Sequence, residues 1–96
     1  MSAKAFLLIE VAVGKSSEVV AALKEIEGVT SADCVTGPYD VIAVVEGERL
    51  DEIGGIVTGK IFGHIPGVPR IVSCMASKEV PPKEETARYS ANYRQD

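Results

Sequence analysis

Tryptophan is absent from the sequence, and histidine and cysteine are scarce, with one histidine and two cysteines in 96 residues. Histidine is the side chain most often used for proton transfer, so the single histidine, His64, gives little means of acid–base catalysis. The cysteines, Cys34 and Cys74, do not have the Cys-x-x-Cys spacing of a metal or redox site. We therefore expect no enzymatic activity, no metal site and no cofactor.

Clusters of positive charge and long apolar runs are missing as well. The 10 lysines and arginines are scattered from Lys4 to Arg94, and 14 acidic residues bring the formal net charge to -4. Because a nucleic-acid backbone is held by clustered positive charge, direct contact with nucleic acid is not expected. Apolar runs such as residues 6–9 are too short to span a membrane, and residues 1–10 lack the features of a signal peptide. These absences predict a cytoplasmic location.

Apolar strands and amphipathic helices alternate along the chain. Strands are expected at residues 5–13, 29–36, 40–46 and 69–76. Apolar residues recur at helical spacing between the first and second strands and again between the third and fourth. Right-handed crossovers in this βαββαβ order interleave the strands as 4-1-3-2, with both helices on one face of an antiparallel sheet. The predicted fold class is α+β, a ferredoxin-like sandwich over residues 1–77, followed by a polar C-terminal tail at residues 78–96.

The two helices carry different signals. A serine of the Ser16-Ser17 pair is expected to cap the first helix, and Gly28 to end it. The second helix is expected to bury one stripe of residues spaced three or four apart: Leu50, Ile53, Ile56, Val57, Ile61 and Ile65. It also contains glycines that each cost roughly 1 kcal/mol against alanine: Gly54, Gly55, Gly59 and Gly63. Two explanations stay open, close approach by a subunit or ligand and a locally irregular helix.

The two central strands of this topology, residues 5–13 and 40–46, are apolar on both faces. Two helices cover one face only, and each Leu or Val side chain left in water forgoes about 1.5–3 kcal/mol. A second copy of the same sheet is the simplest cover for the other face. The pattern therefore predicts a homodimer formed through the sheet.

The two cysteines fall on opposite edge strands of the predicted sheet. Three strand steps of about 4.8 Å separate them by roughly 14 Å, whereas a disulfide tolerates only about 7 Å between Cα atoms. We expect both thiols to be reduced and to be buried as small apolar side chains.

The turn Thr36-Gly37-Pro38-Tyr39-Asp40 joins the second and third strands and is the candidate binding site. Gly37 can adopt a positive φ and leave neighbouring amides free for an anion such as an α-carboxylate. Asp40 is able to accept from an α-ammonium group, and Tyr39 offers a flat wall and a hydroxyl. The alternative is a plain turn, with Asp40 bonded to its own backbone and Tyr39 against the sheet.

Three stretches carry a family resemblance: AFLLIEVAVGKSSEVVAAL, VTGPYDVIAVVEG and HIPGVPRIVSC. Over about residues 4–76 the sequence resembles the ligand-binding RAM domain of the Lrp/AsnC family of transcriptional regulators. Members usually carry a helix-turn-helix before this domain, so the chain looks like a stand-alone version without its own DNA-binding domain.

This resemblance implies a small-effector binding and oligomerisation module, with an amino acid as the effector and the turn from Thr36 to Asp40 lining the pocket. It also implies sheet-mediated dimers, higher oligomers and a possible DNA-binding paralogue as partner. The competing hypothesis is a small dimeric ferredoxin-like enzyme of the monooxygenase or isomerase kind, for which only His64, Ser73 and Cys34 are candidate residues. An ACT-type domain would share the topology and the ligand class.

Overall fold

Four strands and two helical segments form the described part of the chain, residues 3–76 of a computed structural model. The strands are β1 (Ala3–Glu10), β2 (Val29–Cys34), β3 (Val41–Gly47) and β4 (Arg70–Ala76). The helical segments are α1 (Ser16–Lys24) and α2 (Leu50–Ile56), and α2 continues directly into the π-helical turn η1 (Val57–Ile61). The βαββαβ order predicted from the sequence is confirmed.

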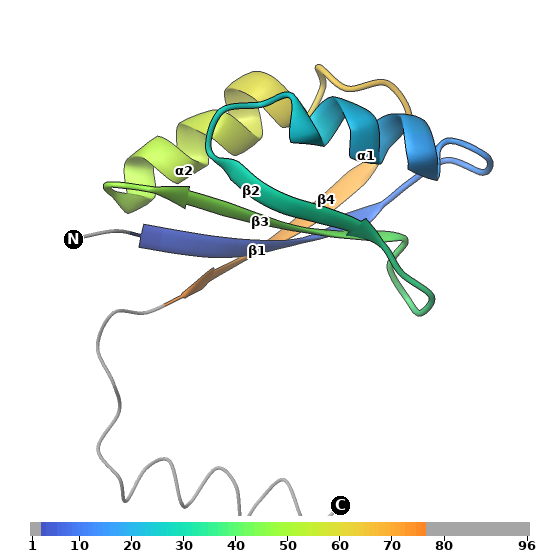
Figure 1. Cartoon of the computed structure of the whole chain (residues 1–96), viewed down its shortest axis with the longest axis horizontal. Helices are drawn as coiled ribbons and strands as arrows, with labels where there is room; N and C mark the ends of the chain where they lie inside the picture. The colour runs from blue at the N-terminus through green and yellow to red at the C-terminus, as the bar shows by residue number, and fades with distance from the viewer. Residues whose placement is uncertain (1–2, 77–96) are drawn as a thin grey trace, which may run out of the picture.

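The strands form one antiparallel sheet in the order β2-β3-β1-β4, which is the predicted order read from the opposite edge. The helices lie together over one face of this sheet, and the other face carries no element of the described chain (Figure 1). Central strands β1 and β3 pair along their length, with Leu7 opposite Ala43. The sheet therefore has a helix-covered face and an open face.

The hydrophobic core lies between the helices and the sheet. In β1 every second residue is buried, and in β3 the partners of Ala5, Leu7 and Ile9 are buried as well. Helical side chains such as Val19, Leu23 and Ile53 complete the core from above and have no exposed surface. The period of two along the strands matches the alternation of side chains across a pleated sheet. No buried polar or charged residue occurs among the described residues.

The open face carries a continuous apolar patch in the middle of the sheet. Cross-strand pairs place its members side by side, since Phe6 lies opposite Val44, and Leu8 lies between Ile42 and Val72. Phe6 is 40% exposed, and the others are half-buried. We call this set the open-face patch: Phe6, Leu8, Ile42, Val44 and Val72. The expectation that the central strands are apolar on both faces while helices cover one is confirmed.

Two details of the helices differ from the prediction. Neither serine caps α1, because the N-cap residue is Lys15, no side chain bonds the free amides there, and Ser16 is already helical. Leu50 is 49% exposed and does not belong to the buried stripe, because it is the first residue of α2 and lies beyond the core. The rest of the stripe packs against the sheet.

The glycines of the second helix coincide with its irregularity. The α-helical ladder of α2 gives way to π-helical hydrogen bonding at Val57. A Cβ atom added to Gly54, Gly55 or Gly59 would meet no other atom within 4 Å, so nothing in the described chain approaches these glycines. The prediction of a locally irregular helix is confirmed, whereas contact with a further subunit or ligand stays a prediction.

The prediction that both cysteines are buried is wrong for the described chain, because Cys34 and Cys74 are free and exposed. Each lies on an edge strand, where the sheet has a neighbour on one side only. Cys74 pairs with Phe6 on the open face, and Cys34 pairs with the buried Val41 and so faces the helix side. The predicted tail, residues 78–96, lies outside the described residues, and the boundary at residue 77 stays a prediction.

Replacement of a core residue in the central strand should destabilise the fold much more than replacement of an exposed leucine. Leu7 has no exposed surface, so Leu7→Ala should cost about 2–5 kcal/mol of unfolding free energy. Leu50→Ala removes the same atoms from an exposed position and should cost about 1 kcal/mol or less. Urea unfolding of both variants at one protein concentration gives the comparison. Similar losses would contradict the placement of the core.

Candidate functional site

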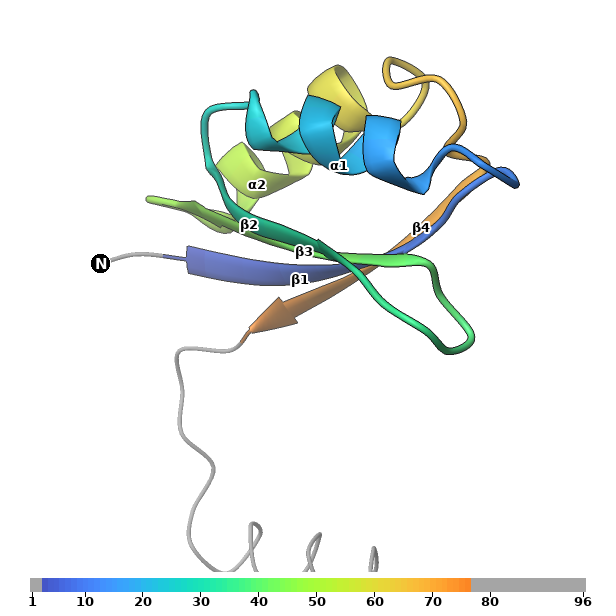
Figure 2. The same cartoon turned by 45° about the vertical axis from the view of Figure 1, so that its right-hand side comes forward.

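The predicted site is the connection between β2 and β3, which bends toward the open-face side of the sheet. Figures 1 and 2 both show this turn extending past the end of the sheet, on the side away from the helices. Thr36, Gly37 and Pro38 are exposed, and Tyr39 and Asp40 are half-buried. All of the predicted site residues therefore lie in one turn beside the open face.

The backbone of this turn is accessible. Gly37 has φ +154, and a Cβ atom there would meet nothing within 4 Å, so space beside the backbone is open. Within the described residues, the amides of Thr36, Gly37 and Tyr39 donate no hydrogen bond to backbone or side chain. Amides without internal partners are the groups that bind anions such as a carboxylate. The positive φ predicted for Gly37 is confirmed.

Asp40 closes the base of the turn through three hydrogen bonds. Its carbonyl accepts from the amide of Val35 at 2.9 Å, and its amide donates to the carbonyl of Ile9 at 3.0 Å. Its side-chain Oδ2 accepts from the amide of Val11 at 2.8 Å. The expected alternative, a carboxylate bonded to its own turn, does not occur, because the carboxylate reaches the chain that leaves β1. Binding of an α-ammonium group by Asp40 stays a prediction.

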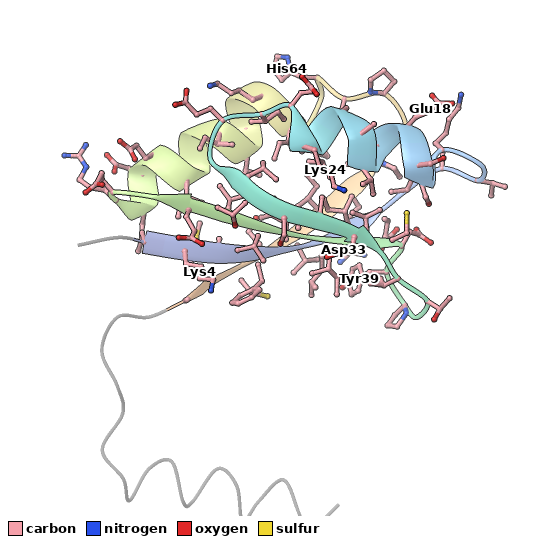
Figure 3. All side chains as sticks on the ribbon, in the orientation of Figure 1. Lys4, Glu18, Lys24, Asp33, Tyr39 and His64 are labelled. Carbon is pink, nitrogen blue, oxygen red and sulfur yellow. The ribbon has the colours of Figure 1, made fainter. Side chains whose placement is uncertain are left out.

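The residues considered for an enzymatic site are not brought together. Cys34 and Ser73 lie on opposite edge strands, which are separated by two further strands. His64 is exposed in the turn after η1, and Figure 3 shows it above the helical layer, on the other side of the sheet from Tyr39. Residues 3–76 contain no group of three or more side chains able to hold a metal ion. Among the helices described, none is long and apolar enough to cross a membrane.

A cavity lies at the end of β3 opposite the turn, and no sequence motif predicted it. The cavity measures about 440 Å³ and is lined by Glu27, Gly28, Glu46, Gly47, Glu48, Glu52, Ile56 and Lys60. The oxygen Oε1 of Glu52 accepts from the amide of Glu48 at 2.8 Å. The lining carboxylates outnumber the single ammonium group, which disfavours the carboxylate of an amino acid there. Its residues come from separate segments, so only the fold brings them together.

Comparison with known proteins places these features in a family. The family model described as the Lrp/AsnC ligand-binding domain matches residues 4–86. A comparison with curated protein sequences found no match.

Several solved structures are similar to this chain. The hypothetical protein PHS023 from Pyrococcus horikoshii has TM-score 0.74 and 32% identity, over 80% of this chain and 92% of that chain. TTHA0845 from Thermus thermophilus has TM-score 0.75 and 30% identity, over 82% of this chain and 98% of that chain. The transcriptional regulator NMB0573 from Neisseria meningitidis, solved as a complex with L-methionine, has TM-score 0.68 and 20% identity, over 82% of this chain and 52% of that chain. With the family match over most of its length, the chain belongs to the Lrp/AsnC ligand-binding domain family.

Proposed function

We propose that this domain binds an amino acid as a small effector, at the turn from Thr36 to Asp40, and assembles through its open face as part of transcriptional regulation. The observation that carries this proposal is the match of residues 4–86 to a ligand-binding domain of transcriptional regulators. The L-methionine complex of the neisserial neighbour supports an amino acid as the effector class. A cytoplasmic location belongs to the same proposal.

The geometry of the turn supports a carboxylate-bearing ligand. The free amides of Thr36, Gly37 and Tyr39 offer hydrogen-bond donors without a competing internal acceptor. Gly37 leaves the backbone uncovered, so a ligand can approach the peptide groups closely. Tyr39 adds an aromatic wall at the half-buried side of the turn. A pocket needs a second wall, and the side of the turn that overhangs the open face is where a partner subunit would supply it.

The open-face patch supports assembly with a second copy. Its members are large apolar side chains, and covering each fully is worth about 1.5–3 kcal/mol. A two-fold axis through the patch would bring each copy's Phe6 and Leu8 against the same surface of its partner. The patch is flanked on β2 by the exposed polar residues Ser31 and Asp33, which fits an apolar interface centre with a polar rim.

Regulation of transcription then requires a partner that contacts DNA. The sequence has formal net charge -4 and no cluster of lysine or arginine. A DNA-binding paralogue that shares the same sheet interface is the partner that this domain would join, either in mixed dimers or in higher oligomers. Enzymatic activity is not proposed, since the structure separates the side chains that it would need.

Calorimetric titration with each proteinogenic amino acid should reveal at least one that binds. Tyr39→Ala should weaken that binding about tenfold, the equivalent of roughly 1.4 kcal/mol, because it removes the wall of the turn. Leu50→Ala, at the far end of the sheet, serves as the control and should bind as the wild type does. If no amino acid gives binding heat, the proposal of an amino-acid effector is wrong.

The two exposed cysteines give an internal test of the sheet interface. Cys74 lies on the open face beside Phe6, and Cys34 faces the helix side. In a dimer formed through the open face, a thiol reagent should modify Cys34 quickly and Cys74 at least about tenfold more slowly, because burial makes a thiol inert. Phe6→Lys should make the two rates similar and give a monomer in sedimentation. Equal rates in a wild-type protein that sediments as a monomer would contradict this interface.

A further inference from the structure

The hydrogen bond from Val11 to the Asp40 carboxylate is exceptional among the side-chain hydrogen bonds of the described chain. It joins residues 29 positions apart and is partly buried. The others are exposed, and they stay within four positions in the sequence, apart from a bond between neighbouring strands from Thr30 to the Val44 carbonyl. The side chain of Asp40 therefore links two separate connections of the fold, the segment after β1 and the turn between β2 and β3.

The bond continues the pairing of β1 and β3 by one step beyond the sheet. The last paired residues are Ile9 and Val41, after which the Asp40 amide still donates to the Ile9 carbonyl. Past this point the chain turns away, and the amide of Val11 has no backbone acceptor in the described structure. The carboxylate of Asp40 takes the place of that acceptor. Loss of the side chain would leave a half-buried amide unpaired, which costs far more than a surface hydrogen bond is worth.

The same connection is fixed on its far side. The amide of Ala12 donates to the carbonyl of Gly67 at 2.9 Å. Gly67 has φ +91, a conformation that favours glycine, and a Cβ atom there would lie only 3.2 Å from the Cβ of Lys15. Figure 2 shows the chain after β1 and the chain before β4 side by side at this end of the sheet. The segment after β1 is thus held between the turn at 36–40 and the turn that precedes β4.

We propose that Asp40 is a positioning residue, which holds the turn at residues 36–39 in place through Val11 and does not contact the ammonium group of the effector. This inference rests on the proposed function for the choice of site. The Val35 and Val11 bonds fix the base of the turn from two directions, and the unpaired amides between Thr36 and Tyr39 that carry a proton lie just beyond that base. A fixed base keeps those amides oriented before a ligand arrives, which lowers the entropy lost on binding.

Asparagine at position 40 separates this role from direct contact with an ammonium group. Asparagine keeps a carbonyl oxygen that can accept from the Val11 amide, but it has no negative charge. A positioning residue needs the acceptor, whereas a partner of an ammonium group needs the charge. Asp40→Asn should therefore behave like the wild type, and Asp40→Ala should not.

Amide hydrogen exchange, followed residue by residue by NMR, tests the positioning role without any ligand. In Asp40→Ala the exchange rates of the hydrogen-bonded amides at the base of the turn, those of Val11, Val35 and residue 40, should rise about tenfold or more, while amides of the central strands keep their wild-type rates. Asp40→Asn should restore the wild-type rates. Asp51→Ala, which removes an exposed aspartate at the start of α2, is the control and should leave the turn unchanged. Unchanged exchange in Asp40→Ala, or no rescue by asparagine, would overturn the proposal.

Calorimetry on the same variants tests the absence of ammonium contact. The probe is L-methionine first, and then the amino acid that binds the wild type most tightly. Asp40→Ala should lose about tenfold in affinity, and Asp40→Asn should stay within about threefold of the wild type. If Asp40→Asn restores the wild-type exchange rates but not the wild-type affinity, Asp40 contacts the effector and the proposal is overturned. If no amino acid binds the wild type, the proposed function fails, and the exchange result alone decides the positioning role. If Asp40→Ala does not fold, the comparison of Asp40→Asn with the wild type decides both.

Discussion

The structure depends on a sheet that is apolar on both faces and on helices that cover only one of them. Strands β1 and β3 present apolar side chains to both sides of the sheet, but the helices lie over one side only. The helix-covered side supplies the core that stabilises the single chain. The other side of the described sheet exposes a row of large side chains across β3, β1 and β4, and burial of these side chains against another apolar surface is favourable. The helix-covered face of the sheet thus stabilises the chain, and the open face is the surface at which association is proposed.

The site proposed for the effector owes its position to the same sheet. The strands end at one side in three connections, and hydrogen bonds of Asp40 and Ala12 link these connections to one another. The turn between β2 and β3 leaves this end toward the open face, so it borders the surface that a second subunit would cover. The acidic cavity lies at the opposite end of β3. A ligand with a carboxylate therefore meets free amides at one end of the strand and repulsive charge at the other.

Much of this architecture follows from local sequence pattern, and the remainder follows from contacts that pattern does not encode. Strand order was predictable because two right-handed crossovers in one sheet leave a single arrangement. The exposure of the cysteines was not, because it depends on their positions at the edges of the folded sheet and, for Cys74, on the open face. The exposure of Leu50 likewise depends on where the core ends.

The site shows the same division between local pattern and tertiary contact. The turn and the positive φ of Gly37 were predictable, since Gly-Pro after an edge strand favours a turn. The partner of Asp40 was not, because Val11 is distant in sequence and nothing local distinguishes its amide from its neighbours. The acidic cavity was hidden for the same reason, since its glutamates come from separate segments.

The hydrogen bond between the Val35 amide and the Asp40 carbonyl has a consequence for how the domain can diversify. It closes the hairpin before the exposed residues begin, so the side chains of residues 36–39 are not needed to pair the strands. Residues 36–39 can therefore be exchanged, or grafted from a related chain, with little effect on the fold beneath. If the effector binds at this turn as proposed, its chemistry can change at these positions without change to the strands that carry them.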